Sequence, residues 1–299
     1  MKWACDLIDD NLKKVSREYP HIQVTKNISF VLEDPEVDLI AIATQPETHF
    51  RLGNLVLDAG KHLWIEKPFT TSLGEAKKLL EKAKQRKKYL HVDLPFIFYG
   101  PVVKIKELLE KRVIGKPLYF TSSRTNLGLI QRKIDVVWDL APHDLSIIFY
   151  LFPDLKVKKV GIHGSSPVGQ GKKHQIANLV IEFNRNFTAY IHLSWLSPAK
   201  IRLITIGGKR KMILFDDIHP TEKIKIYDKN VTIKRSEITP FVPVYRSGDV
   251  LMPVFSQQEA LANEINFLYE QLVTSHKQYY TAEIGLKILD IMEKVSLKA

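Results

Sequence analysis

The sequence predicts two domains, an α/β domain followed by an α+β domain. Over the first ~115 residues, apolar strand-like segments alternate with amphipathic helix-like segments, which is typical of a parallel sheet covered by helices. After Gly115-Lys116-Pro117, strand-like segments follow one another directly, and this indicates an antiparallel sheet. The 299 residues are sufficient for two such cores. We therefore place the domains at 1–116 and 117–299.

The elements of the first domain are predicted from apolar runs separated by Gly and Pro. The segment 37–44 is almost continuously apolar, as expected for a strand buried on both faces. Gly60 follows a helical pattern and supplies the left-handed residue that commonly ends a helix. Ser29, and either Thr71 or Ser72, are the expected helix N-caps. We expect strands at 1–6, 22–24, 37–44, 62–65 and 89–93, and helices at 9–19, 29–33, 48–59, 71–87 and 101–111.

The second domain is predicted to consist mainly of consecutive strands. Asn184-Arg185-Asn186 and Gly207-Gly208 are expected to form tight turns between them. The segment 165–173 has the Gly-rich polar composition of a loop. We expect strands at 118–125, 157–163, 176–183, 188–195, 202–206, 211–215 and 223–227, and helices at 136–151, 253–273 and 281–295.

The overall composition excludes several classes of protein. Cys5 is the only cysteine, so no disulfide can form within the chain, which fits a reducing, cytoplasmic location. No apolar run reaches the ~18 residues of a membrane span, and the first residues lack the apolar stretch of a secretory signal. The net charge is +11, which could attract nucleic acid or anionic lipid. We interpret its densest basic run, 82–88, as a solvated helix end, because no nucleic-acid-binding motif accompanies it.

Glu66-Lys67-Pro68 is the first group of residues with a possible chemical role. The apolar run 62–65 predicts a short buried strand, and Pro68 cannot continue a central strand. Glu66 and Lys67 therefore lie at the carboxyl end of this strand, the edge at which parallel α/β sheets bind ligands. The alternative is a solvated charged pair without a function.

Asp139 and His143 form the second group. They are four residues apart and share one face of the predicted helix 136–151. Histidine exchanges a proton near neutral pH, and a neighbouring carboxylate can orient it. Hydride removal from a carbinol needs a base for the hydroxyl proton and a cation near the developing oxyanion. A Lys67/Asp139/His143 site is therefore plausible, and a surface Asp–His pair is the alternative.

Other reactive residue types show no useful spacing. The histidines are scattered, without an acid or thiol at metal-ligand spacing, so we expect no metal site. Cys5, Trp138 and Trp195 are expected to be ordinary core side chains.

Motifs lie in a fixed order along nearly the whole chain: Asp34-Pro35-Glu36-Val37-Asp38-Leu39-Ile40-Ala41-Ile42-Ala43-Thr44, Pro46-Glu47-Thr48-His49, Ala59-Gly60-Lys61-His62 with Glu66-Lys67-Pro68, Gly115-Lys116-Pro117, Trp138-Asp139-Leu140-Ala141-Pro142-His143-Asp144 and Gly207-Gly208. Together they resemble the glucose–fructose oxidoreductase / inositol dehydrogenase / MocA (Gfo/Idh/MocA) family. The resemblance implies a Rossmann domain, parallel and doubly wound, that binds NAD or NADP. It also implies a second domain whose open, mainly antiparallel sheet carries the substrate and often the interface of a homo-oligomer, a dimer or tetramer.

The resemblance also implies roles for individual residues. Lys67 would lie between nicotinamide and substrate, His143 would be the acid/base, and Asp139 would hold the substrate or orient His143. The other implied contacts are Asp6 at the adenosine ribose, Glu66 at the nicotinamide side, Thr44, Pro46 and His49 along the cofactor, and Arg124, Asn126 and Gln131 at the substrate.

The chain departs from the family pattern at two places. The family's opening strand and Gly-rich loop, which hold the pyrophosphate, do not precede Asp6. We expect a start codon placed at an internal Met1 or a truncated gene; a chain of this length would have a truncated Rossmann sheet without a central strand and would bind cofactor weakly. Leu94-Pro95-Phe96 replaces an expected His-Thr-Phe, which removes a possible polar substrate contact.

Three functions follow from these observations. The first is an NAD(P)-dependent oxidoreductase acting on a secondary hydroxyl of a sugar, nucleotide sugar or cyclitol. The second is a catalytically impaired or non-catalytic member of the family, motivated by the absent loop. The third is a basic nucleic-acid or membrane-surface binder, whose binding would fall steeply with salt. A resemblance over the whole fold outweighs net charge, so we favour the first, with a small-molecule substrate and neither nucleic acid nor membrane as a partner.

Overall fold

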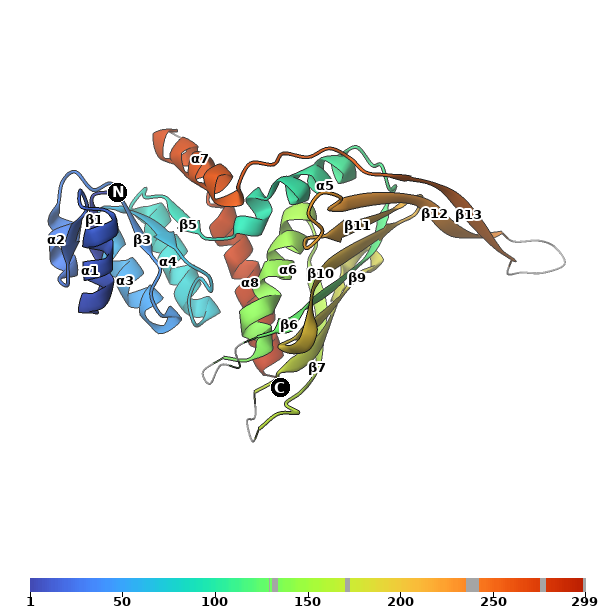
Figure 1. Cartoon of the computed structure of the whole chain (residues 1–299), viewed down its shortest axis with the longest axis horizontal. Helices are drawn as coiled ribbons and strands as arrows, with labels where there is room; N and C mark the ends of the chain where they lie inside the picture. The colour runs from blue at the N-terminus through green and yellow to red at the C-terminus, as the bar shows by residue number, and fades with distance from the viewer. Residues whose placement is uncertain (129, 131–133, 170–172, 235–241, 275–277, 298–299) are drawn as a thin grey trace. The chain divides into compact units, whose positions relative to one another are not determined.

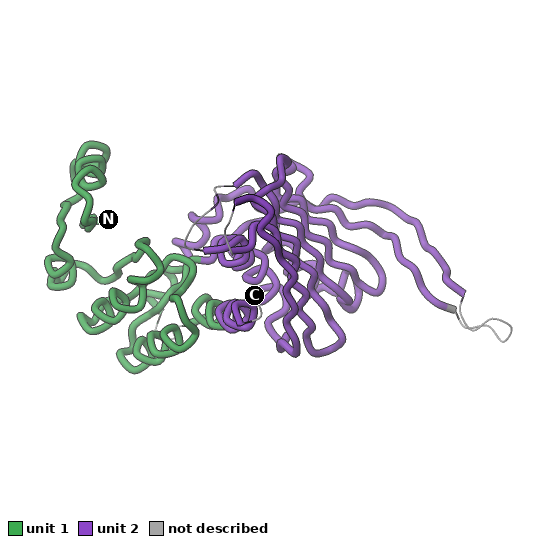
Figure 2. Tube along the Cα trace, turned by 90° about the horizontal axis from the view of Figure 1, so that it is seen from below, with its two compact units in different colours: residues 1–93, 268–286 green, residues 94–267, 287–299 purple. Residues whose placement is uncertain are grey.

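The computed structural model describes residues 1–299 except 129, 131–133, 170–172, 235–241, 275–277 and 298–299. Two compact units make up the chain (Figure 2). The first contains Met1–Asp93 and Leu268–Leu286, and the second contains Leu94–Phe267 and Lys287–Ala299. None of the described helices is long and apolar enough to cross a membrane.

The first unit has the predicted alternation of strands and helices, and all its strand pairs are parallel. These strands form two separate sheets, β1-β2 and β3-β4-β5. Asn27 caps α2 by accepting from the Ser29 amide, so the expectation that Ser29 is the cap was wrong. Ser72 caps α4, one of the two predicted alternatives. The elements are β1 (Trp3–Cys5), α1 (Asp9–Glu18), β2 (Gln23–Thr25), α2 (Ile28–Glu33), β3 (Leu39–Ile42), α3 (Pro46–Asp58), β4 (His62–Ile65), α4 (Leu73–Gln85) and β5 (Leu90–Val92) (Figure 1).

A segment from near the C-terminus completes the core of the first unit. The Thr281 hydroxyl accepts a hydrogen bond from the Val92 amide at 3.1 Å, and the Thr281 side chain is fully buried. A Cβ added at Gly285 would lie 3.2 Å from the Phe69 ring, so glycine permits close packing there. Chain order alone could not reveal this contribution.

The second unit is built on an eight-stranded sheet in the order β13-β12-β11-β10-β6-β9-β8-β7. All its strand pairs are antiparallel except β6–β9, so the predicted mainly antiparallel sheet is confirmed. Helix α6 packs against β9 and β8 (Figure 1). Its elements are η1 (Pro95–Phe98), α5 (Gly100–Glu110), β6 (Pro117–Leu127), α6 (Val136–Leu151), β7 (Val157–Ser165), β8 (Ile176–Phe183), η2 (Asn184–Asn186), β9 (Phe187–Ser194), β10 (Leu196–Gly208), β11 (Met212–Asp216), β12 (Ile224–Lys234) and β13 (Val242–Leu251). The last two helices, α7 (Ala260–Val273) and α8 (Tyr280–Ser296), each contribute residues to both units.

Two expectations for the second half of the chain were wrong, and one strand was missed. Gly207 and Gly208 end strand β10 rather than forming a turn, and both positions require glycine because a Cβ would collide with the Tyr119 ring or the Ile114 carbonyl. Helix α7 starts at Ala260, not at 253. Residues 252–259 form neither helix nor strand, and the Ser256 carbonyl packs directly on Gly100. Strand β13 was not predicted.

Candidate functional site

The carboxyl ends of β3, β4 and β5 bring Thr44, Lys67 and Asp93 to one edge of the three-stranded sheet. Ile42 pairs with Ile65, and Ile65 pairs with Val92, so the residues that follow these strands are neighbours. The edge is therefore the one at which a parallel sheet presents its ligand-binding residues.

Lys67 lies at this edge beside Glu66, whose pKa is raised by burial and lowered in part by the positive charge of Lys67. Its side chain is half-buried, and among the residues that the structure describes its ammonium makes no hydrogen bond or ion pair. A partly buried ammonium with unused donors can bind an acceptor or an anion at low desolvation cost, because part of that cost has already been paid on folding.

Glu66 and Asp93 form a carboxyl pair beside Lys67. Burial, together with the hydrogen bond and the negative charge of Asp93, raises the pKa of Glu66 to about 8. Asp93 also has one buried carboxyl oxygen without a partner among the described residues. Two carboxyls in contact favour sharing one proton over full ionisation. Sequence reasoning did not select Asp93, although its place at the end of a predicted strand was a usable signal.

The raised pKa of Glu66 predicts a pH-dependent stability. Its protonated form is favoured in the folded state, so its contribution is complete below the ordinary pKa of 4.5 and is lost as the pH rises through about 8. We expect the urea midpoint of the wild type to fall between about pH 5 and about pH 9 by more than that of Glu66→Gln, which cannot ionise. Parallel pH profiles of the two proteins would contradict the shared proton.

His91 and His49 are the buried histidines of this edge. Burial lowers the pKa of His91 to about 4. His49 is fully buried, with Nδ1 2.9 Å from the Pro68 carbonyl and Nε2 3.0 Å from the Thr44 carbonyl. It therefore ties the loop after β4 to the loop after β3. This position favours a structural role over the predicted direct cofactor contact.

Three further predicted cofactor residues lie at strand and helix ends of the first unit. Thr44 is exposed, and its hydroxyl is 2.6 Å from that of Thr48. Pro46 opens α3, where its fixed φ suits the first helical turn. Asp6 follows β1 and accepts from the Ile8 amide and the Asn11 side chain, contacts that lower its pKa. Their contact with a cofactor remains a prediction.

Asp139 and His143 lie on α6 in the second unit, and neighbouring side chains hold both. The Trp195 indole, only 2% exposed, donates to Asp139 Oδ2 at 2.9 Å. The ring of His143 meets Phe96 edge-on, with 5.2 Å between centroids, and its carbonyl accepts from the Ser146 hydroxyl. The helix thus presents an oriented carboxylate and a half-buried imidazole one turn apart, as predicted from their spacing.

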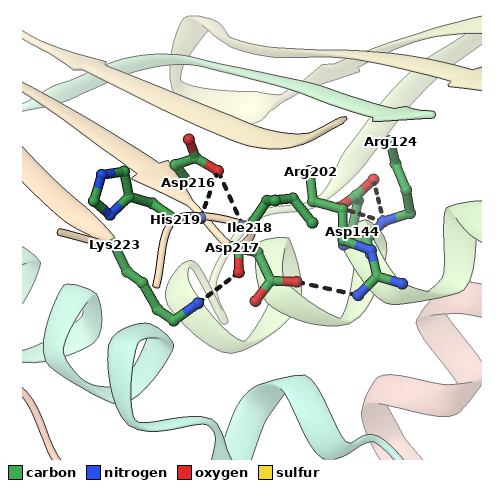
Figure 3. Close-up of polar contacts among 8 residues, drawn as sticks. All are labelled: Arg124, Asp144, Arg202, Asp216, Asp217, Ile218, His219 and Lys223. Atoms are coloured by element: carbon green, nitrogen blue, oxygen red, sulfur yellow. Dashed lines mark hydrogen bonds and ion pairs between the residues drawn. The ribbon is translucent and has the colours of Figure 1, made fainter. Parts of the chain in front are cut away.

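Arg124 has a different environment from the predicted one (Figure 3). Its guanidinium donates to both carboxyl oxygens of Asp144, with Nη2 2.8 Å from Oδ1, and the two side chains are 5% and 1% exposed. It also lies 4.8 Å from the centre of the Phe96 ring. The guanidinium thus anchors α6 to β6, and its burial against Asp144 favours a structural role over the predicted substrate contact.

A second polar group beside it was not predicted (Figure 3). Arg202 donates to the Asp217 carboxylate at 3.2 Å, and Lys223 donates to the Asp217 carbonyl. Burial and Asp217 raise the pKa of Tyr99 to about 12, so Tyr99 stays protonated as a donor. The residues are far apart in sequence, so no local pattern could indicate them.

The other residues selected from the sequence differ in how deeply they are buried. Asn126 is half-buried near the end of β6, and Gln131 lies outside the described residues. Trp195 is a core residue as expected, Trp138 is half-buried, and Cys5 is exposed, so the expectation of a core cysteine was wrong. No cluster of three metal-ligating side chains occurs among the described residues.

Two family models match successive parts of this chain. Residues 5–94 match a model described as an oxidoreductase family with an NAD-binding Rossmann fold, and residues 102–213 match the Gfo/Idh/MocA C-terminal domain. The chain belongs to the Gfo/Idh/MocA family of oxidoreductases. The cofactor of this family model is NAD, so NAD or NADP is the cofactor class.

Individual relatives match over different extents. The uncharacterized oxidoreductase YdgJ of Escherichia coli is 33% identical over 148 residues, 46% of this chain and 43% of YdgJ. The UDP-N-acetylglucosamine 3-dehydrogenase of Acidithiobacillus ferrooxidans is 24% identical over 259 residues, 85% of this chain and 76% of that protein. A solved structure of that dehydrogenase superposes with a TM-score of 0.79 at 22% identity, covering 99% of this chain and 88% of its own. The match to YdgJ thus spans less than half of that relative.

Proposed function

We propose that the chain is an NAD(P)-dependent dehydrogenase that acts on a secondary hydroxyl of a sugar, nucleotide sugar or cyclitol. The observation that carries the proposal is the half-buried ammonium of Lys67, which makes no hydrogen bond or ion pair with the described residues, at the carboxyl edge of a sheet in an oxidoreductase family. Relatives named scyllo-inositol 2-dehydrogenase (NAD(+)) and UDP-N-acetylglucosamine 3-dehydrogenase support the substrate class.

The cofactor would accept or donate the hydride, and the edge of the first unit suits its nicotinamide end. Asp93 has a buried oxygen that lacks a donor, and a carboxamide N–H could satisfy such an atom. The protonated Glu66 beside it adds no negative charge at neutral pH, which keeps the edge compatible with a cofactor that carries phosphates.

The residues of the chain would divide the remaining chemistry. Lys67 would stabilise the negative charge that develops on the substrate oxygen. His143 would take the hydroxyl proton during oxidation and return it during reduction. Asp139, held at one oxygen by Trp195, keeps its second oxygen for the substrate or for the His143 ring. Asp6, Thr44 and Pro46 remain proposed cofactor contacts, and Asn126 remains a proposed substrate contact.

Cofactor binding tests this proposal first. We expect NADH or NADPH fluorescence to rise saturably on titration with the protein, followed by turnover with a member of a panel of sugars, nucleotide sugars and cyclitols. Lys78→Ala, an exposed change on α4, is the control and should leave binding unchanged. The absence of both binding and turnover would contradict the proposal.

The second candidate is a family member that is catalytically impaired. The observation in its favour is that the described parallel strands form two separate sheets, whereas a dinucleotide site usually spans a continuous one. Binding of NADH without turnover of any member of the panel would favour this candidate.

A further inference from the structure

A cavity of about 350 Å³ lies in the second unit, away from His143. Its apolar lining includes Leu109, Leu151, Phe152 and Phe187. Leu151 ends helix α6, eight residues after His143, or ~12 Å along the helix axis at the usual rise. The cavity is therefore separate from the candidate catalytic residues, although one helix contributes to both.

The cations that line this cavity make no short hydrogen bond or ion pair with the described residues, although Lys106 Nζ also lies 5.9 Å from the centre of the Tyr150 ring. Lys106 Nζ lies 3.4 Å from the Leu151 carbonyl and 3.5 Å from the Glu110 carboxylate, beyond the usual ~2.7–3.2 Å of a hydrogen bond. Its side chain is only 21% exposed. Arg185 is likewise 3.5 Å from Asp154.

Lys116 is the third of these cations. It is exposed, and its ammonium has no hydrogen-bond or ion-pair partner in the part of the chain that the structure describes. Three cations face two acids in the cavity lining, so the charge balance at its walls is positive.

We propose that this cavity is a binding site for a small organic anion with an aromatic or other apolar body. The volume is in the range of small-molecule sites, ~300–1,000 Å³, which are typically apolar with a few polar groups that fix orientation. The apolar body of the ligand would contact the leucine and phenylalanine side chains. Its carboxylate or phosphate group would accept hydrogen bonds from Lys106 and Lys116. The site does not depend on the proposed reaction.

The probe is 8-anilino-1-naphthalenesulfonate, compared with its uncharged analogue N-phenyl-1-naphthylamine. Both should be titrated by fluorescence into the whole protein in saturating NAD⁺, which does not fluoresce and which occupies the cofactor site. We expect one saturable site for the sulfonate and at least about tenfold weaker binding of the neutral compound, because only the anion meets the cations. Equal affinities would contradict the proposal.

Variants then locate the site. Lys116→Glu, an exposed change, should weaken sulfonate binding at least about fivefold, and Leu109→Trp should abolish it by filling the cavity. Lys104→Glu, the same charge reversal on α5, is the control, because Lys104 pairs with Glu107 and does not line the cavity. Circular dichroism confirms that each variant is folded. Unchanged binding in Lys116→Glu would place the probe elsewhere and overturn the proposal.

Competition identifies the head group. Displacement of the bound sulfonate by phenyl phosphate, by benzoate or by both supports the site and shows which oxyanion it prefers. Displacement by neither compound contradicts it.

Discussion

Arg124→Leu is expected to lower the free energy of unfolding by about 3–5 kcal/mol, the usual cost of removing one partner from a buried ion pair. The reason is Asp144, which is 1% exposed and has the Arg124 guanidinium on both oxygens. Without the Arg124 guanidinium, the Asp144 carboxylate remains in the core without a counter-charge. Chemical denaturation of the wild type and the variant measures the difference.

Two further variants separate this explanation from a general loss of packing. Arg124→Leu with Asp144→Leu should be more stable than Arg124→Leu alone, because an apolar pair carries no desolvation cost. Arg185→Leu removes an ion pair whose side chains are 61% and 72% exposed, and it should cost less than about 1 kcal/mol. A double variant no more stable than the single one would show that the charge of Asp144 is not the cause.

Lys67→Ala is expected to reduce turnover by about 10²–10⁴-fold, the usual effect of removing one group that stabilises charge or moves a proton. The ammonium is half-buried and makes no hydrogen bond or ion pair with the described residues, so its removal breaks neither kind of contact there. The fold and stability should stay close to those of the wild type. Initial rates, followed through the absorbance of reduced nicotinamide, give the loss.

The pattern of losses distinguishes a catalytic lysine from a binding one. If Lys67 acts on the developing charge, kcat falls while the affinity for NADH, measured by fluorescence, changes little. Lys78→Ala removes an exposed lysine from α4 and should retain full activity. Turnover of Lys67→Ala within a factor of about two of the wild type would exclude the proposed role.

The sequence was informative wherever a local pattern determines the structure. Segment 37–44 contains strand β3, as its apolar run predicted, but only Ile42 is buried and Ala41 is exposed, so the expectation of a strand buried on both faces was wrong. Asp139 and His143 are four residues apart, about one helical turn, and this spacing predicted that they share one face of α6. The position of Lys67 at the carboxyl end of β4 was predictable because Pro68 cannot continue a central strand.

The rest depends on contacts between residues that are distant in sequence. Arg124 is 20 residues from Asp144, and nothing near it indicates that its charge is buried and paired. Gly207 was predicted to form a turn, but the Tyr119 ring on the neighbouring strand explains why this position is glycine: it leaves no room for a side chain. Asp93 and Glu66 become a pair only when β4 and β5 align.

The two ends of the chain depend on each other during synthesis. Residues 268–286 belong to the first unit, where Thr281 bonds to Val92 and Gly285 packs on Phe69. Most of this unit precedes residue 94, so its core cannot be completed before residues 268–286 have been synthesised. Until then, the apolar residues that pack against this segment stay exposed in the nascent chain, where a chaperone can protect them.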